Sequence, residues 1–302
     1  MGKASIIIPT YNAGELFTQV LEGIFLQSEQ PAEVIVIDSS SSDGTDERAK
    51  AFPVKFQTIS KSEFGHGKTR NYGARIAEGD YVVFLTQDAV PRDESWLKNI
   101  IRSLDGGTAG VAGSFSRQIA RDHAVPMEKF FYSKFYPGES KLIAKSDVRL
   151  QRILFSNASS AMRRSFILDH PFDEDILMSE DLAWAYRVLD EGYRISYEAD
   201  SLVTHSHDAS FVLLFKRYFD FGVSHVEIRM KGEQDSVYFG KGLVTVLEEL
   251  KYLATNGHTS WLPRSVSYNA AKFLGLLVGR NHRLLPRSVK RRLTSSYKEH
   301  WA

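Results

Sequence analysis

The first 88 residues alternate short apolar runs with segments of helical character, and this rhythm constrains the fold more than any other feature. Ala4–Pro9 is a continuous apolar run of the kind that forms a buried parallel strand. Further strand-like runs follow at Glu33–Ile37, Phe56–Ile59 and Tyr81–Leu85. Helices are expected between them, over residues 12–27, over the tract SSSSDGTDERAKAF and over residues 69–77. This order predicts an α/β fold with a mostly parallel sheet and helices on both faces.

Polar side chains follow three of these strands at the point where each strand ends. They are Thr10-Tyr11-Asn12, Asp38-Ser39 and Gln87-Asp88. Asn12 also has a suitable side chain to cap the first helix. Ligands of open α/β sheets bind outside the carboxyl ends of the strands, so these residues are candidates for one binding site.

The bulk composition excludes some classes of protein. Of the 302 residues, 43% are apolar and 25% charged, as in an ordinary soluble globular protein. A net charge of +1 gives no reason to expect a nucleic-acid partner. The absence of cysteine excludes disulfides and thiolate catalysis, and it suits a reducing compartment such as the cytoplasm. No apolar run approaches the ~18 residues that a membrane span needs, and the longest candidates lie near Phe273–Val278.

The remaining two thirds of the chain give weaker patterns. Residues 113–155 are rich in aromatic and basic side chains and are expected to form loops with a helix. A helix is predicted over Ser179–Glu191 and strands over Tyr193–Val203. Beyond about Phe211 the pattern is helical, including Leu243–Leu253 and Tyr268–Val278.

Asp88 is the first candidate for metal chemistry. It follows the Tyr81–Leu85 strand, where a carboxylate can hold Mg²⁺ or Mn²⁺, but it can equally cap the turn before Pro91. Gln87 beside it either donates hydrogen bonds to a ligand or faces solvent.

Two further constellations each allow two interpretations. Glu180-Asp181 opens a helix, where acidic residues favour the helix dipole, yet one carboxylate could also serve as a general base. His205 and His207 lie two residues apart in a strand-like run and therefore share a face. One imidazole would suit a metal site, and the alternative is a pair of surface histidines.

The segment FGHGKTRNYGA, residues 64–74, combines glycines with His66, Lys68 and Arg70. Glycine lets the backbone approach a ligand, and the cations can pair with phosphate. The segment matches neither the GxxxxGK[ST] loop nor GxGxxG, so it supports neither a nucleoside triphosphatase nor a dehydrogenase. A turn followed by a helix start would explain the glycines alone.

Taken in order, four motifs resemble glycosyltransferase family 2, the inverting enzymes of the GT-A fold. They are SIIIPTYNAGE, VIVIDSSSSDGT, TRNYGARIAEGDYVVFLTQDA and SEDLAWAYRVLDEGYRISY. The resemblance covers residues 3–210 and implies a GT-A transferase domain there. The helical pattern beyond it predicts a C-terminal extension over residues 211–302. FGHGKTRNYGA joined to FLTQDAVP is similar to bacterial rhamnosyltransferases that use dTDP-L-rhamnose for cell-surface polysaccharide such as O-antigen.

The resemblance also implies roles for individual residues. The nucleotide-sugar donor would be bound by Pro9, Thr10, Tyr11, Asp38, Arg70, Asn71 and Gln87, with Asp38 accepting from the pyrimidine imide. Asp88 would be the ligand of Mg²⁺ or Mn²⁺, with His205 as the later metal-proximal residue and His207 as its alternative. Glu180-Asp181 would supply the catalytic carboxylate, Asp181 being the base.

Thr86 departs from the family's pattern, since it stands where the DxD motif has its first aspartate. One carboxylate fewer predicts weaker or altered metal binding. Alternatives to rhamnosyl transfer are a family 2 enzyme that uses a UDP-sugar and a non-catalytic nucleotide-sugar-binding protein. A nucleotidyltransferase would need a glycine-rich basic loop after the first strand, where this chain has Pro9-Thr10-Tyr11-Asn12.

The C-terminal segment RNHRLLPRSVKRRL, residues 280–293, mixes cations with leucines. It either caps the domain as a basic helix or docks peripherally on an anionic membrane that carries a lipid-linked saccharide acceptor. The second interpretation would place the protein at the inner face of the plasma membrane.

Overall fold

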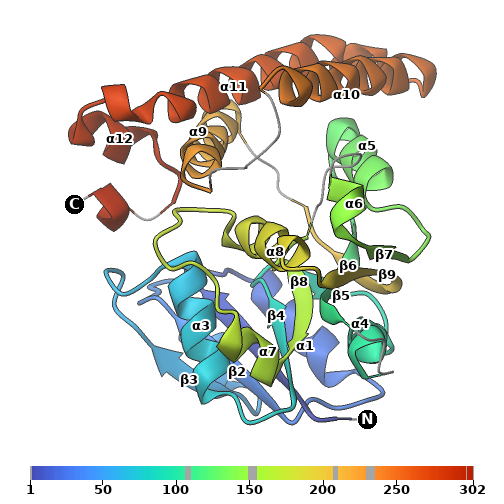
Figure 1. Cartoon of the computed structure of the whole chain (residues 1–302), viewed down its shortest axis with the longest axis vertical. Coiled ribbons are helices and arrows are strands. Elements are labelled where there is room, and N and C mark those ends of the chain that lie inside the picture. The colour runs from blue at the N-terminus through green and yellow to red at the C-terminus, as the bar shows by residue number, and fades with distance from the viewer. Residues whose placement is uncertain are drawn as a thin grey trace. The chain divides into compact units, whose positions relative to one another are not determined.

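A computed structural model describes residues 2–105, 110–148, 155–206, 210–228, 235–296 and 298–301, with backbone alone at 148, 235–241 and 299. The chain divides into two compact units. The sheet unit comprises Met1–Arg121, Phe135–Asp175 and Glu180–Ser206. The helical unit comprises Asp122–Lys134, Ile176–Ser179 and His207–Ala302. Figure 1 shows the whole chain, coloured from blue at the N-terminus to red at the C-terminus.

The N-terminal half of the sheet is parallel, as the alternation predicts. Its order is β3-β2-β1-β4, from β3 (Lys55–Thr58), β2 (Glu33–Asp38), β1 (Ala4–Thr10) and β4 (Tyr81–Leu85). Antiparallel β8 (Ser159–Arg163) continues it, followed by β6 (Val111–Ile119), β9 (Arg194–Thr204) and β5 (Val90–Pro91), while β7 (Lys141–Ile143) pairs with β9. The predicted α/β class is confirmed, although the half beyond β4 mixes parallel and antiparallel pairs.

Helices cover both faces of this sheet. Ile6 and Ile8 of β1 pack in one core with α1 (Leu16–Phe25) and α4 (Trp96–Asp105). On the other face Gly73 of α3 (His66–Ile76) approaches Ile7 so closely that an added Cβ would lie 2.5 Å from its Cγ2 atom. Glycine is therefore required at this crossing of helix and strand. The ring of Phe84 packs against Phe172, and Phe172 in turn contacts Trp184 of α8 (Glu180–Asp190).

Two local expectations were wrong, and a third was incomplete. Asn12 does not cap α1, because its Oδ1 accepts from the Ser42 N–H (3.0 Å) and its N–H donates to Ser41 Oγ (2.8 Å). Helix α3 begins at His66 rather than Thr69, with Gly65 as its extended N-cap. Residues 113–155 contain most of the central strand β6, and they also include α5 (Pro126–Phe135) and α6 (Lys145–Val148).

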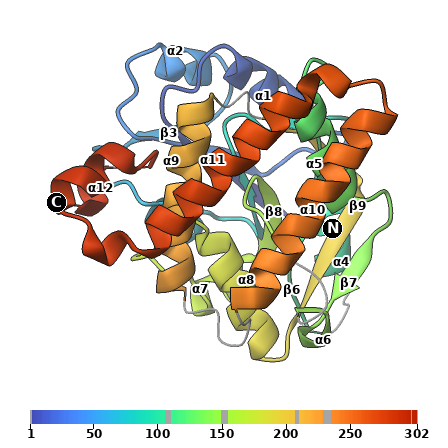
Figure 2. The same ribbon diagram turned by 90° about the horizontal axis from the view of Figure 1, so that it is seen from above.

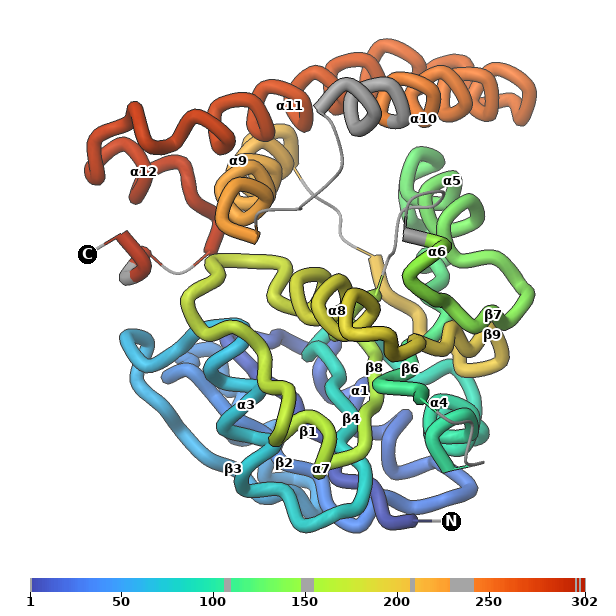
Figure 3. Tube along the Cα trace, viewed as in Figure 1, coloured from blue at the N-terminus to red at the C-terminus, as the bar shows by residue number. Residues whose placement is uncertain are grey.

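The short connecting helices of the sheet unit are α2 (Thr45–Lys50) and α7 (Arg164–Asp169). Figure 3 traces how β4 and β8 lie side by side, with α7 directly after β8. This pairing matters for function because β8 begins beside the end of β4, where the predicted site lies.

The helical unit is built on α9 (Phe211–Glu227), α10 (Asp235–Thr255), α11 (Leu262–Arg280) and α12 (Arg287–Leu293). Figure 2 shows α11 crossing α9, with α10 beside α11. Three short 3₁₀ segments, η1 (Thr259–Trp261), η2 (His282–Leu284) and η3 (Lys298–Trp301), join or end these helices. Buried Asp220 accepts from the N–H groups of Ser295 and Ser296 and so holds the C-terminal segment on α9. We retain 3–210 and 211–302 as a proposed division into transferase domain and extension.

Among the described residues, no helix is both long enough and apolar enough to span a membrane.

Candidate active site

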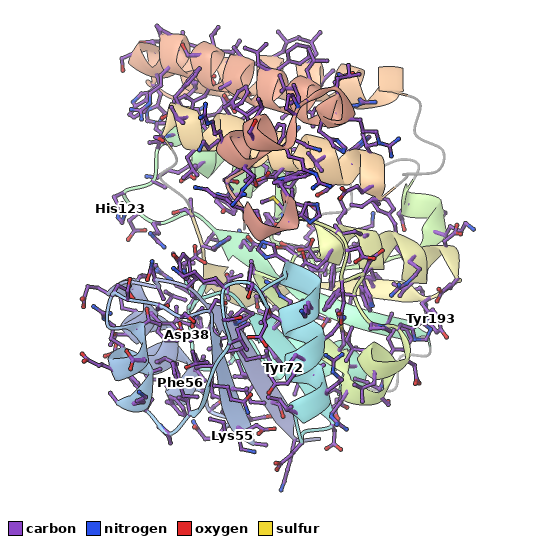
Figure 4. All side chains as sticks on the ribbon, turned by 90° about the vertical axis from the view of Figure 1, so that its left-hand side faces the viewer. Asp38, Lys55, Phe56, Tyr72, His123 and Tyr193 are labelled. Carbon is purple, nitrogen blue, oxygen red and sulfur yellow. The ribbon has the colours of Figure 1, made fainter. Side chains whose placement is uncertain are left out.

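The ends of β1 and β2 meet through predicted donor-binding residues. Their parallel register pairs Pro9 with Ile37 and Thr10 with Asp38. Thr10 Oγ1 donates to Asp38 Oδ1 (2.9 Å), while the N–H of Ser41 donates to Asp38 Oδ2 (2.8 Å). Figure 4 shows Asp38, the last residue of β2, toward one end of the strands and Lys55, the first residue of β3, toward the other. The Asp38 carboxylate is thus oriented, and Oδ2 retains capacity for another donor.

Tyr11 and Gln87 join the ends of β1 and β4. The Tyr11 N–H donates to Gln87 Oε1 (2.8 Å), and Gln87 Nε2 donates to the Tyr11 carbonyl (3.2 Å). The Tyr11 ring is exposed, with Lys61 Nζ 4.8 Å from its centroid and donating to its hydroxyl (2.9 Å). An exposed aromatic ring with a cation over one face suits a flat, polar ligand such as a nucleobase.

Strained backbone occurs at the edges of this region. Asn12, Ser40 and Ser179 have positive φ angles of 45°, 57° and 67°. Asn12 and Ser40 follow the ends of β1 and β2, and Ser179 precedes the Glu180-Asp181 pair. Such conformations cost about 1–3 kcal/mol for residues with a side chain, and they concentrate at functional sites.

A buried ion pair fixes the start of α8. Arg70 Nη1 donates to Glu180 Oε1 at 2.9 Å, with the two side chains only 7% and 5% exposed. Asn157 Nδ2 donates to the same oxygen (3.1 Å). Burial would raise the pKa of Glu180, but Arg70, with His66 and Asn157, outweighs it and holds that pKa below its usual range. Glu180 is therefore a fixed negative charge.

Asp181 is held differently although it is the next residue. Its Oδ2 accepts from the Asn157 N–H (3.0 Å) and its Oδ1 from the Leu182 N–H (2.7 Å). Burial and the neighbouring charge of Glu180 nevertheless raise the pKa of Asp181 to about 7. A carboxylate with a pKa near neutral pH is suited to accept a proton as a general base.

Asp88 and His205 form the candidate metal pair. His205 Nε2 lies 3.5 Å from Asp88 Oδ1. On the other side of the ring, Nδ1 lies 2.9 Å from Gln118 Oε1. In the neutral tautomer whose Nδ1–H donates to Gln118 Oε1, Nε2 is the ring atom directed at the Asp88 carboxylate. A cation held jointly by Nε2 and the Asp88 carboxylate would suit this arrangement.

The residues present fit a divalent cation only as a partial set. Adjacent ligands of an octahedral Mg²⁺ at about 2.1 Å lie about 3 Å apart, so a spacing of 3.5 Å needs little adjustment. Within the described ranges no three histidine or acidic side chains gather at one point. Diphosphate oxygens and water would complete the shell. The alternative ligand His207 lies outside the described residues.

These groups lie along one edge of the sheet. Tyr11 and Gln87 link β1 to the end of β4. The Thr86 N–H donates to the Ala158 carbonyl (3.2 Å), which links the end of β4 to the start of β8. Asn157, one residue earlier, contacts both carboxylates of the Glu180-Asp181 pair. Hydrogen bonds between neighbouring strand ends, together with the short backbone segments between them, therefore join the donor, metal and base candidates.

One predicted residue faces elsewhere. Asn71 exchanges two hydrogen bonds with the backbone of Phe172, donating at 2.9 Å and accepting at 3.0 Å. These contacts anchor the loop before α8, and a ribose contact from Asn71 stays a prediction. Sequence reasoning missed Asn157, Gln118 and Lys61. A single amide side chain, whether just before a strand as Asn157 is or within one as Gln118 is, gives no local signal, so only the folded chain identifies these two residues.

The strand ends of this α/β sheet carry an oriented aspartate, a candidate cation pair and a carboxylate suited to accept a proton. This combination is typical of the class of nucleotide-sugar transferases with the GT-A fold. The family model described as Glycosyl transferase family 2 matches residues 5–170. The chain belongs to glycosyltransferase family 2, so the resemblance seen in its motifs is confirmed.

Two similar relatives span nearly the whole chain. O-antigen chain rhamnosyltransferase WbaN of Salmonella anatum is 35% identical over 308 aligned residues, which cover 100% of this chain and 96% of the relative. O-antigen chain rhamnosyltransferase RfbN of Salmonella typhimurium is 34% identical, with 99% and 96% covered. The similarity to bacterial rhamnosyltransferases inferred from the motifs is confirmed.

Solved structures share the fold at lower identity. A mannosyltransferase from Pyrobaculum calidifontis, solved with GDP-Man and Mn²⁺, superposes with a TM-score of 0.63 at 18% identity and covers 91% of this chain and 87% of its own. Staphylococcus aureus TarS with UDP-GlcNAc gives a TM-score of 0.56 at 18% identity, covering 97% and 84%. These likenesses support the fold alone.

Proposed function

We propose that this protein is an inverting rhamnosyltransferase that moves L-rhamnose from dTDP-L-rhamnose to a saccharide hydroxyl in O-antigen synthesis. The rhamnosyltransferases that match this chain over nearly its full length favour this donor over a UDP-sugar. The observation that carries the catalytic part is Asp181, a carboxylate with a pKa of about 7. It lies on the sheet edge that also bears Asp38 and Asp88.

The proposed reaction is a single in-line displacement. Asp181 accepts the proton of the acceptor hydroxyl while the acceptor oxygen bonds to the anomeric carbon of rhamnose. The bond from that carbon to the diphosphate oxygen breaks on the opposite face, so dTDP leaves and the configuration inverts. Glu180 does not take the proton, because Arg70 holds it ionised in a buried pair.

The donor would be held by residues that the fold has already oriented. Asp38 Oδ2 would accept the thymine imide N–H, since Ser41 and Thr10 fix the carboxylate. Tyr11, kept in place by Gln87, would lie against the base. Pro9, half-buried between Ile8 and Thr10, would shape the same edge.

Asp88 and His205 would hold Mg²⁺ or Mn²⁺, which when bound supplies positive charge for the departing diphosphate. Gln118 keeps the His205 ring in the orientation that this requires. The presence of Thr86 in place of a second carboxylate predicts weaker cation binding than in a site with both.

The acceptor in this proposal is a saccharide, either free or lipid-linked. The enzyme would work in the cytoplasm, in peripheral contact with the inner face of the plasma membrane when the acceptor is carried by a lipid.

Donor binding and transfer can be tested separately. Thermal shifts with dTDP, UDP and GDP should show the largest stabilisation by dTDP, increased by Mn²⁺ and reduced by EDTA. Transfer of rhamnose from dTDP-L-rhamnose should be abolished in Asp181→Asn, while that variant still binds dTDP. Asp175→Asn, which alters an exposed carboxylate on the loop before α8, is the matched control and should keep both properties. Stabilisation by UDP alone would exclude the proposed donor, and near-normal turnover of Asp181→Asn would exclude Asp181 as the base.

A further inference from the structure

Helix α11 buries small residues and exposes large apolar ones, the reverse of an ordinary amphipathic helix. Within α11, all of which the structure describes, the buried residues are Ser265, Ala271, Gly275, Leu276 and Gly279. Its exposed apolar side chains are Val266, Phe273, Leu274 and Leu277, with Phe273 and Leu274 each 49% exposed. The helix therefore presents its most hydrophobic face to solvent.

Close contact with α9 prevents α11 from rotating to hide this face. A Cβ atom added at Gly275 would meet the Phe215 carbonyl, and one at Gly279 would meet the Phe219 carbonyl. Gly222 of α9 faces Leu276 and Gly279 in the same way. Larger side chains cannot enter this interface, so Phe273 and Leu274 must stay on the outer side.

Neighbouring elements also carry exposed apolar side chains. Leu243, Val244 and Leu247 of α10 are exposed at helical spacing, and Leu284 after α11 is 82% exposed. At the start of α11 the Arg264 guanidinium lies 5.0 Å from the ring centroids of both Trp261 and Tyr268. Aromatic rings beside a cation are typical of groups that lie between water and lipid.

The charge of this region is strongly one-sided. Residues 262–302 contain nine Lys and Arg residues and one acidic residue, a net charge of +8. The whole chain carries +1, so the preceding residues together carry −7. Several of these cations follow one another in and around α12, where Arg287, Arg291 and Arg292 are exposed. Such a surface complements an anionic one and would repel a second copy of itself.

We propose that α10, α11 and α12 form a docking surface for an anionic lipid bilayer. Phe273, Leu274 and Leu284 enter the boundary between headgroups and acyl chains, and the cations of residues 280–292 contact the anionic headgroups. This inference rests on exposure and charge, and it holds whichever sugar the enzyme transfers.

The test is flotation of the full-length protein with vesicles of phosphatidylcholine alone or with 30% phosphatidylglycerol. We expect binding to the anionic vesicles that weakens as salt is raised. Arg287→Gln/Arg291→Gln/Arg292→Gln should weaken partitioning on the order of a hundredfold. Phe273→Ser/Leu274→Ser should also release the protein. The control Leu26→Ser/Leu168→Ser, at exposed apolar positions of the sheet unit, should bind as the wild type does.

Three outcomes would overturn the proposal. The first is equal binding of the wild type to both kinds of vesicle, and the second is wild-type binding by both the triple arginine variant and Phe273→Ser/Leu274→Ser. The third is a dimer in solution that Phe273→Ser/Leu274→Ser converts to monomer. The last result would assign the surface to a second copy of the chain. Circular dichroism and the thermal shift with dTDP confirm that each variant is folded. Because that shift reports the donor site, loss of lipid binding with dTDP binding retained would leave the proposed sugar transfer intact.

Discussion

Replacing Asp181 with Asn should stabilise the folded protein at alkaline pH while it abolishes catalysis. Burial and Glu180 raise the pKa of Asp181 from 3.8 to about 7. A folded-state pKa above the unfolded value means that the unfolded chain binds fewer protons between these values, so stability falls as pH rises from about 4 to 7. The folded protein therefore bears a cost at pH 8 that the neutral amide of the Asp181→Asn variant removes.

The pH-dependent part of this cost can be worked out by linkage. With pKa values of 3.8 and about 7, Asp181 destabilises the fold by about 2 kcal/mol at pH 5 and about 4 kcal/mol at pH 8. Asn also loses one hydrogen bond, because its single amide oxygen can accept from only one of the Asn157 and Leu182 N–H groups and its amide nitrogen is a donor. That loss of about 1–3 kcal/mol does not vary with pH. The advantage of the variant should thus grow by about 2–3 kcal/mol between pH 5 and pH 8, as an upper bound, since Asp181 is partly exposed.

The assay is thermal unfolding at a series of pH values, with EDTA and without nucleotide, because bound charges would change the pKa. The difference in Tm between Asp181→Asn and wild type should increase by about 5–10 °C from pH 5 to pH 8. Asp175→Asn, an exposed carboxylate on the loop before α8, should show a constant difference. If the Tm difference between Asp181→Asn and wild type does not change with pH, then ionisation of Asp181 does not destabilise the fold. The argument that the pKa of Asp181 is raised would then fail.

Further predictions concern Glu180, the Asp88–His205 pair and Gly73. Glu180→Gln should shift the acid limb of the kcat/KM profile to lower pH, because the charge that raises the pKa of Asp181 is removed; an unchanged limb would exclude this coupling. It should also lower the free energy of unfolding by on the order of 3 kcal/mol, measured by urea titration, since Arg70 loses its buried counter-charge. Asp88→Asn and His205→Ala should each remove the Mn²⁺-dependent part of the thermal shift with dTDP but keep the metal-independent part; a full Mn²⁺ response in both would place the cation elsewhere. Gly73→Ala should lower the free energy of unfolding by about 1–3 kcal/mol because its Cβ meets Ile7, whereas Gly242→Ala, with open space around it, should not destabilise the protein.

The sequence predicted the part of the fold that local pattern determines. The strands that carry Thr10, Asp38 and Gln87 are continuous apolar runs, and the parallel order then brings their ends to one edge. The central strands β6 and β8 were missed because their buried positions include serines. Ser116 shares hydrogen bonds with Ser159 (2.7 Å) and Ser201 (2.7 Å), and Trp96 Nε1 donates to Ser159 (3.0 Å). Polar residues that satisfy one another inside a core resemble a loop when each is considered separately.

The Glu180-Asp181 pair shows what a sequence motif leaves open. Two acidic residues at the start of a helix satisfy its dipole equally well, and nothing in the local pattern separates their roles. The fold separates them, because α3 brings Arg70 against Glu180 alone, while Asn157 at the start of β8 gives Asp181 only a backbone N–H. Glu180 is thereby kept ionised, and its charge in turn raises the pKa of Asp181. Adjacent carboxyl groups with pKa values moved in opposite directions are the arrangement that one fixed charge and one proton acceptor require. In the proposed mechanism this division of roles depends on two contacts from distant parts of the chain, because Arg70 comes from α3 and Asn157 directly precedes β8.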